Sequence, residues 1–423
     1  MIYLGQQPPG VAVSIVVDRS GKHVPVTDHN RRELSRRGAF AAVAYAFGVT
    51  MLSTTLPTPL YPLYRRELGF SELIVTVVFA AYAAGVIIAL LVFGNASDAV
   101  GRRRVLLPAL VVALLSAAVF LAEQDLAMLF VGRVLSGLAA GLFTGTGTVT
   151  LVELEPPGSR GRGSLVATLV NMGGLGLGPL LAGVIAEYGA IPLRTTYVID
   201  LVLLVPAIAV VLVTPETVTE RSRLRRPSLG VPAEVRGVFA QAALAGFAGF
   251  VVLGTFTGVS PAALSQVMDV HNLFVIGLVV FAVFAASTAG QLGSSRFRAR
   301  IALPLGAAVL CVGALGIAAA LWQRSLALLV VGGIVAGFGQ GLGFRAGIGA
   351  VTAAAPPEQR GAVTSVLFLV LYIGISVPVV GIGLGIRASG VQTAGIGAAL
   401  AVAALEAIAW LSLVLRPVAE QPR

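Results

Sequence analysis

The stretch Gly94-Asn95-Ala96-Ser97-Asp98-Ala99-Val100-Gly101-Arg102-Arg103-Arg104 decides how this chain folds. It lies between two long apolar runs, residues 73–93 and 105–121. Ionisable side chains are costly inside a bilayer, so an acid followed by three consecutive arginines does not belong in hydrocarbon. The stretch therefore predicts a tight loop at one face of a membrane, between two spanning helices.

A fainter copy of this loop returns 196 residues later in the chain. The matching positions are Gly94, Asp98, Arg102, Arg104 and Pro108 with Gly290, Ser294, Arg298, Arg300 and Pro304. A second set keeps an offset of 200: Pro156, Pro157, Arg160 and Gly161 with Pro356, Pro357, Arg360 and Gly361, Gly137 and Gly141 with Gly337 and Gly341, and Gly183 with Gly383. Chance does not hold one register over such a length. We expect two homologous halves, as in rocking transporters.

The composition is that of an integral membrane protein. Of the 423 residues, 57% are hydrophobic and 11% are charged, whereas soluble domains carry about 25% charged residues. The 51 glycines suit closely packed membrane helices. Cys311 is the single cysteine, which excludes a disulfide framework and a cysteine-based metal site. The net charge of +10 comes from arginines between apolar segments, so it indicates basic loops rather than nucleic-acid binding.

Twelve apolar stretches approach the roughly 20 residues that a spanning helix needs. They lie near 38–62, 73–94, 105–122, 126–151, 163–186, 193–214, 237–260, 272–292, 301–322, 325–351, 362–386 and 391–415. We predict an all-α membrane protein of twelve helices in two six-helix bundles. The expected parts are a tail at 1–37, bundles at 38–214 and 237–415, a polar linker at 215–236, and a tail at 416–423.

Charge placement predicts the topology. With the N-terminus in the cytoplasm, inner segments hold 22 of the 29 Lys and Arg residues, and outer loops hold five. Cytoplasmic loops of membrane proteins are enriched in Lys and Arg. We therefore expect a multi-pass protein of the inner or plasma membrane with both termini cytoplasmic. The start Met1-Ile2-Tyr3-Leu4 lacks the basic region of a signal peptide, so residues 1–37 are read as a flexible tail.

At this point the sequence resembles the major facilitator superfamily over all twelve spans. The loop matches that family's motif A at Gly94, Asp98, Gly101, Arg102 and Arg103. Span 4 resembles motif B, with Arg133 followed by Gly137, and span 5 resembles motif C, with Gly174, Gly178, Pro179 and Gly183. Motif C implies the twelve-span drug:proton antiporter branch. Ala99, Ala182 and Ser294 depart from the family pattern.

Asp98 is the expected gate residue of the loop. Its carboxylate could accept hydrogen bonds from backbone N–H groups at the start of span 11, where the helix dipole is positive. Such a latch would favour the outward-facing state and weaken on protonation. The alternative is a structural salt bridge at the inner face. Glu153 and Glu155, at the end of span 4, are the expected partners of Arg102 and Arg103.

Three ionisable residues at membrane depth are candidates for proton coupling: Arg133, Asp200 and Glu406. Such groups normally face a cavity or a partner, and the resemblance implies a role for Arg133 in proton movement. The alternatives are a structural pair of Arg133 with Asp200, and a Glu406 that only neutralises Arg345.

Two further features concern shape and substrate. Pro179, after Gly178, deletes one backbone hydrogen bond and should bend span 5, as Pro378 should bend span 11; small-residue packing is the simpler reading of the glycines. The fold implies a cavity lined by spans 1, 4, 7 and 10. The polar candidates in those spans are Tyr45, Thr54, Gln241, Gln340 and Arg345, although helical hydroxyls often bond only to their own backbone.

These patterns favour a secondary transporter and not an enzyme. His23, His29 and His271 lack the spacing of metal ligands, and no nucleotide-binding motif is present, so we expect neither metal nor cofactor. The most favoured function is proton-coupled efflux of drugs or other small molecules by a monomer in a lipid bilayer. Proton-coupled uptake of a sugar, amino acid or organic anion is the alternative, and a non-transporting membrane scaffold is the outside alternative.

Overall fold

The computed structural model describes residues 15–17, 23–25, 34–94, 96–156, 158–159, 161–218 and 230–417. Two short strands, β1 (Ile15–Val17) and β2 (His23–Pro25), pair antiparallel within the expected N-terminal tail. All the other regular elements of the described residues are helices. Most of the expected N-terminal tail, half of the expected linker, and residues 418–423 lie outside the described residues.

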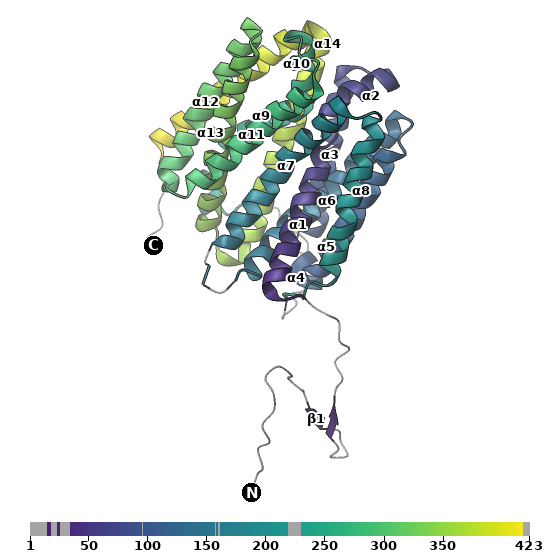
Figure 1. The fold of residues 1–423 in the computed structure, drawn as a ribbon. Coiled ribbons are helices and arrows are strands. Elements are labelled where there is room, and N and C mark those ends of the chain that lie inside the picture. The colour runs from purple at the N-terminus through teal and green to yellow at the C-terminus, as the bar shows by residue number, and fades with distance from the viewer. Residues whose placement is uncertain are drawn as a thin grey trace.

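The first part of the chain forms the helices that are coloured purple to teal in Figure 1. They are α1 (Arg36–Thr55), η1 (Thr58–Leu60), α2 (Tyr61–Leu68), α3 (Glu72–Phe93), α4 (Ala96–Val100), α5 (Arg103–Leu121), α6 (Leu126–Glu153), α7 (Arg162–Tyr188) and α8 (Pro192–Leu212). The green and yellow part contains η2 (Ala233–Val235), α9 (Arg236–Gly258), α10 (Ser260–Val267), α11 (Leu273–Ser294), α12 (Ala299–Gln323), α13 (Leu326–Ala354), η3 (Pro357–Gln359) and α14 (Arg360–Leu415).

Eleven helical segments of the described residues are long and apolar enough to cross a membrane, and the last holds two crossings. That segment, Pro357–Leu415, has 59 residues, whereas one crossing takes about 20. Gly390 interrupts α14 with φ 82° and ψ 165°, a non-helical conformation that glycine tolerates without steric cost. The chain turns at Gly390, so the prediction of twelve spanning helices is confirmed.

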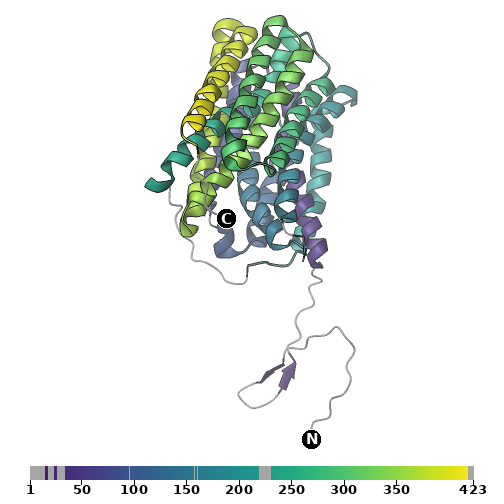
Figure 2. The ribbon, with the colours of Figure 1, turned by 90° about the vertical axis from the view of Figure 1, so that its left-hand side faces the viewer.

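The two offset matches in the sequence correspond to repeated packing. A Cβ atom added at Gly137 of α6 would lie 2.0 Å from the carbonyl oxygen of Tyr82 in α3. At the matching Gly337 of α13, an added Cβ atom would lie 2.5 Å from the carbonyl oxygen of Val283 in α11. The helix starts repeat as well, since Asp125 caps α6 and Ser325 caps α13 through the N–H three residues on. Two similar six-helix bundles therefore stand side by side (Figures 1 and 2).

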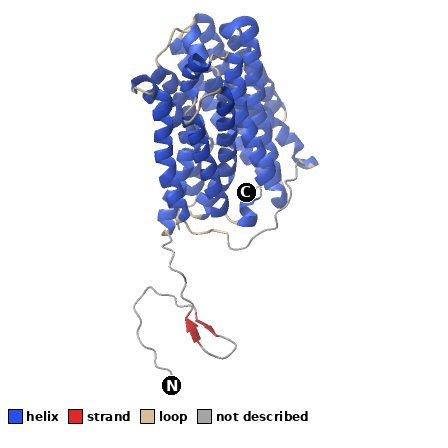
Figure 3. Cartoon of the chain, turned by 90° about the vertical axis from the view of Figure 1, so that its right-hand side faces the viewer, coloured by secondary structure: helices blue, strands red, loops and turns tan. Residues whose placement is uncertain are grey.

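The outer surface of these bundles suits lipid. Val202, Val312 and Val377 are 65%, 63% and 63% exposed, and each lies within a long spanning helix. Figure 3 shows the long helices running side by side. A helix satisfies its backbone hydrogen bonds within itself, as a lipid environment requires. Large apolar side chains on such a surface are stable in hydrocarbon and unfavourable in water.

Twelve passes bring the start of α1 and the end of α14 to the same side of the bundle, here called the terminal side. The opposite side is called the distal side. The two bundles meet where α7 packs against α11 and α3 packs against α14. Gly183 of α7 lies against the carbonyl of Leu273 in α11, and its counterpart Gly383 of α14 lies against Thr76 in α3. Glycines at matching positions of the two halves thus allow close packing at the interface between the bundles.

Candidate functional site

A cavity of about 680 Å³ lies between the two bundles. Its walls come from the terminal-side ends of α3, α6, α7 and α13 and from the first part of α14, with Gln291 from α11. It reaches the edge of the bundle, because Asp98, Arg102 and Arg360 also line it. The volume falls in the range of about 300–1,000 Å³ that is usual for small-molecule sites.

Polar contacts between the bundles close the distal side. Glu72 of α3 accepts hydrogen bonds from Arg65 of α2 and from Gln266 of α10 in the second bundle. Glu187, at the end of α7, accepts from the backbone N–H of Leu273 at the start of α11, 2.8 Å away. A separate hollow of about 340 Å³ on this side shares no lining residue with the large cavity.

The Gly94–Arg104 loop is organised around Arg102, which is only 7% exposed. Its guanidinium donates to Glu153 at 2.9 and 3.2 Å, to Ser97 at 2.7 Å and to Asp98. Burial lowers the pKa of Arg102, but the hydrogen bonds and charges of Glu153 and Asp98 outweigh it, so the pKa is raised overall. Arg102 therefore stays charged and ties α4 to the end of α6.

Glu216, which the sequence reading missed, completes this cluster. Its carboxylate accepts from the backbone N–H of Arg102 at 2.7 Å and from that of Val218 at 3.3 Å. Gly101 has φ 113°, and a Cβ atom there would lie 2.4 Å from the Glu216 carboxylate, so the position requires glycine. The available signal was an acid just after span 6, on the same side as the loop.

Among the described residues, Asp98 makes no hydrogen bond to the start of span 11. The latch was expected for the outward-facing state, so it stays a prediction. Asp98 pairs with Arg102, and its side chain remains 53% exposed. Gly361 and Ser365, at the start of α14, line the same cavity mouth without bonding to it. The terminal side is open here, and an open mouth separates the acid from that helix.

Of the two partners expected for the loop arginines, Glu153 is confirmed and Glu155 is not. Glu153 binds Arg102, as predicted. Glu155 instead accepts from the backbone N–H of Arg162 at 2.8 Å. Arg103 donates to the carbonyl oxygen of Thr214, 3.2 Å away, beyond the end of α8.

Arg133 and Asp200 do not form the alternative pair, although both are 1% exposed. Arg133 donates to the carbonyl of Thr54 at 2.7 Å and to the Tyr61 hydroxyl, and its guanidinium lies over the Tyr61 ring. Asp200 accepts from the Ser53 hydroxyl at 2.7 Å, and its second oxygen has no partner in the described part of the chain. The two charges contact neighbouring residues of α1 and not each other.

Glu406 and Arg345 are not paired either, so the neutralisation expected between them is wrong. Glu406 is 1% exposed, and neither of its carboxylate oxygens has a hydrogen-bond partner among the described residues. Cys311 is a neighbour and donates to the carbonyl of Ala403 at 3.4 Å. Arg345 lines the large cavity.

Of the five polar residues expected in the cavity, the structure places only Arg345 in its wall. Tyr45 donates to the carbonyl of Leu203 at 2.9 Å, and Gln241 donates to that of Arg416 at 2.8 Å, so both face helices of their own bundle. Thr54 bonds to the carbonyl of Met51 in its own helix, at 2.7 Å. Gln340 accepts from Ser287 of α11, at 2.6 Å.

The expected wall helices also differ. Spans 4 and 10 line the cavity as α6 and α13, but α1 and α9 do not, and α3, α7, α11 and α14 take part instead. The sequence reading missed Asn171, Gln291 and Phe368 in this wall. Asn171 and Gln291 were visible as polar residues within apolar spans.

The span 5 glycines pack α7 against α1. A Cβ atom at Gly178 would lie 2.4 Å from the carbonyl oxygen of Leu52, and one at Gly174 would lie 2.5 Å from that of Gly48. Pro179 lacks the N–H that would bond to the carbonyl of Leu175 four residues earlier. The hydroxyl of Thr55 in α1 donates to that carbonyl, at 2.9 Å. Close packing therefore brings the donor that satisfies the freed carbonyl.

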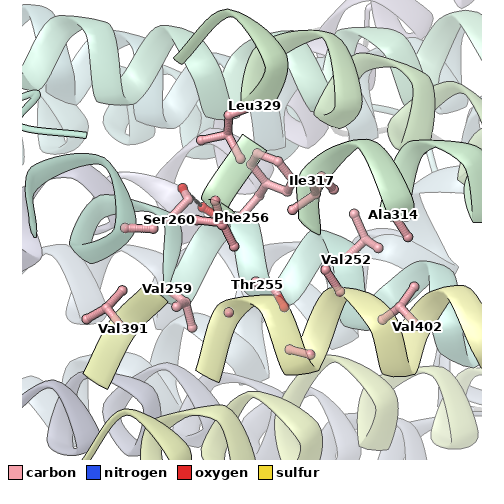
Figure 4. A pocket seen from close by; sticks show the side chains of 15 residues that line it. Val252, Thr255, Phe256, Val259, Ser260, Ala314, Ile317, Leu329, Val391 and Val402 are labelled. Carbon is pink, nitrogen blue, oxygen red and sulfur yellow. Dashed lines mark hydrogen bonds between the residues drawn. The ribbon is translucent and has the colours of Figure 1, made fainter. Parts of the chain in front are cut away.

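A second, narrow cavity of about 50 Å³ lies inside the second bundle (Figure 4). Val252, Phe256 and Ile317 are among its apolar lining. The hydroxyls of Thr255 and Ser260 bond to carbonyls of Val251 and Phe256, so they offer little to a ligand. The space suits a few waters at most. In the part of the chain described, no three His, Cys, Asp or Glu side chains gather as a metal site.

Comparisons with known proteins agree with this fold. The sequence matches the Major Facilitator Superfamily over residues 39–379. A Salmonella typhimurium protein named for multidrug resistance, MdtD, is 28% identical over 148 residues, covering 35% of this chain and 32% of MdtD. An uncharacterized MFS-type transporter of Mycobacterium tuberculosis is 32% identical over 147 residues, covering 34% of this chain and 21% of that protein. The match thus spans a third or less of these relatives.

Solved structures match over most of the chain. A bacterial homologue of the human lysosomal transporter Spinster, in an inward-facing and unoccupied conformation, has a TM-score of 0.68 at 16% identity, covering 92% of this chain and 99% of that one. The human organic anion transporter MFSD10 has a TM-score of 0.60 at 17% identity, covering 90% and 100%. Such low identity shows the fold alone. Together with the family match, it identifies this chain as a member of the Major Facilitator Superfamily, a family of membrane transporters and not of enzymes.

Proposed function

We propose that this chain exports drugs or other small molecules by alternating access, in exchange for protons. The observation that carries the proposal is the cavity of about 680 Å³ between the bundles, which reaches the terminal side while polar contacts close the distal side. A site open to one side at a time is what alternating access requires. The segment that resembles MdtD, a protein named for multidrug resistance, supports export.

The buried carboxylates Asp200 and Glu406 are the groups proposed to carry protons. Burying an ionised carboxylate without full compensation costs far more than burying a protonated one. Within the described part of the chain, one oxygen of Asp200 and both oxygens of Glu406 have no hydrogen-bond partner. Each is therefore suited to gain or lose a proton when its surroundings change. Arg133 is proposed to act with Asp200 through the adjacent α1 residues Thr54 and Ser53, which they contact.

The loop centred on Arg102 is proposed as the gate of the terminal side. In the described conformation its bonds run to α6 and to the segment after α8, all within the first bundle. When the cavity mouth closes, Asp98 and the start of α14, which now line that mouth together, would approach and form the predicted latch. The charge asymmetry of the loops supports a cytoplasmic terminal side and the inner or plasma membrane as location. A monomer contains the whole proposed site.

Proton-coupled uptake is the second candidate, and the arginines of the cavity favour an organic anion as its substrate. A growth-inhibition panel in expressing cells would first select a compound against which the protein protects. Transport of that compound is then measured in proteoliposomes with an imposed pH gradient. Flux opposite to the proton gradient supports export, flux in the same direction supports uptake, and absence of flux contradicts both.

Two variants test the proposed gate and coupling residues in the same assay. Asp98→Asn and Arg133→Ala should each abolish transport, while the protein remains folded in the membrane by size-exclusion chromatography and thermal melting. Arg387→Gln, an exposed arginine of α14 outside the cavity, serves as the control and should transport normally. Normal transport by both Asp98→Asn and Arg133→Ala would overturn the assigned roles.

A further inference from the structure

We infer that the large cavity binds its substrate through an anionic group held by Arg345, with an aromatic or other apolar body packed beside it. This inference rests on the proposed role of the cavity as the transport site. It specifies the charge of the substrate, which the export proposal leaves open.

Arg345 is the first observation. It lies in α13, nine residues before the helix ends at Ala354 on the terminal side. At about 1.5 Å per residue, it is well inside the membrane. Its side chain lines the cavity, and it forms no hydrogen bond or ion pair within the described part of the chain. An arginine at such depth normally has a partner, so a partner from outside the chain would complete this site.

The other charged groups near the cavity do not supply that partner. Asp98 is the one carboxylate among the residues that line it, and it pairs with Arg102 at the mouth. The remaining lining charges are the arginines Arg345 and Arg360. Arg360 donates to the carbonyl of Ala355, at 3.4 Å. The wall therefore has a surplus of positive charge, which favours anions and disfavours organic cations.

The apolar part of the wall lies next to Arg345 in sequence and in space. Phe344 precedes it and lies edge-on to Phe368 of α14, with ring centroids 6.1 Å apart. Both rings line the cavity, together with Phe93 of α3. Asn171 of α7 adds a hydrogen-bonding side chain. A guanidinium beside aromatic rings suits a flat amphiphilic anion, because it binds a carboxylate or sulfonate in a bidentate manner while the rings hold the body.

Two xanthene dyes of opposite charge test this inference directly. Fluorescein is anionic, and rhodamine 123 has a similar ring system with a positive charge. Binding of each dye to the purified full-length protein in lipid nanodiscs is measured by fluorescence anisotropy at pH 7.4. We expect the wild type to bind fluorescein at least tenfold more tightly than rhodamine 123.

The variants separate charge from folding. Arg345→Gln should weaken fluorescein binding at least tenfold, whereas Arg345→Lys should retain part of it. Arg387→Gln, which removes an exposed arginine outside the cavity, should bind as the wild type does. If Arg345→Gln fails to fold, Arg345→Lys still decides, because loss of bidentate pairing with retained charge should weaken fluorescein more than rhodamine 123.

Three results would overturn the inference: no binding of fluorescein, tighter binding of rhodamine 123, or equal fluorescein binding by wild type and Arg345→Gln. Failure of the inference is distinguishable from failure of the export proposal. Proton-driven export of cations that does not depend on Arg345 would remove the inference and leave export intact. Arg345-dependent fluorescein binding without proton-driven flux would support the inference and contradict the export proposal.

Discussion

The terminal and distal sides of the molecule use the same kinds of side chains in different ways. On the distal side, the acids Glu72 and Glu187 bond across the boundary between the bundles. On the terminal side, Asp98, Glu153 and Glu216 bond to Arg102 inside one bundle, and the cavity opens beside them. Acids that bridge the bundles close a side, whereas acids that stay within one bundle leave it open.

The largest expected effect comes from the glycine that allows the bundles to touch on the distal side. Gly183→Ala would place a Cβ atom 2.6 Å from the carbonyl oxygen of Leu273 and force α7 away from α11. Overpacking of this kind costs about 1–3 kcal/mol. The distal side should open, and transport should fall at least tenfold in proteoliposomes.

Gly173→Ala is the matched control for that prediction. It lies in the same helix, and its added Cβ would meet no atom within 4 Å. Alanine also favours a helix over glycine by about 1 kcal/mol. Transport by Gly173→Ala should therefore equal that of the wild type. Equal transport by both alanine variants would contradict the claim that close packing at Gly183 closes the distal side.

A smaller effect is expected from the polar contacts on the same side. Glu72→Ala removes the acceptor of both Arg65 and Gln266, and hydrogen bonds to a charged group contribute about 1.5–3 kcal/mol at most. The readout is labelling of a cysteine that replaces the cavity residue Thr148, in a chain that also carries Cys311→Ala. With Glu72→Ala, we expect this cysteine to be labelled threefold to tenfold faster from the distal side. Asp269→Ala, an acid whose side chain is 95% exposed on the distal side, should leave labelling unchanged.

The smallest effect concerns Glu123, an acid in the distal turn between α5 and α6. Burial raises its pKa, and the charges of Glu67 and Asp125 raise it further. A carboxyl with a raised pKa in the folded state costs stability as pH rises through that pKa. Glu123→Gln should therefore raise the melting temperature slightly at neutral pH, and the gain should vanish in acid. An equal gain at all pH values would contradict this cause.

The sequence predicted the fold well because long apolar spans and repeated glycines determine it locally. Gly137 and Gly337 lie at helix contacts, as their shared offset indicated. The partners of the buried charges were less predictable. The depth of Arg133, Asp200 and Glu406 follows from their position along a span, but the direction that each faces depends on how the helices pack.

The cavity wall was the least predictable part, because it depends on the conformation as well as on the fold. In the described state, the first part of α14 and the end of α3 line an open mouth, and α1 packs against α7 through Gly174 and Gly178. One sequence must be compatible with conformations in which each side is open and closed, so the sequence alone does not indicate which residues line the cavity in a given conformation. The latch predicted at Asp98 requires a closed terminal side, so the described conformation does not test it.

One measurement tests the central claim, that the cavity opens to the terminal side while the distal side is closed. Because Cys311 is the single cysteine, Cys311→Ala with Thr148→Cys gives one reactive thiol in the cavity wall. A membrane-impermeant maleimide is applied to right-side-out or inside-out membrane vesicles at rest. The account predicts rapid labelling from the terminal side and at least tenfold slower labelling from the distal side. Equal labelling from both sides, or faster labelling from the distal side, would contradict it.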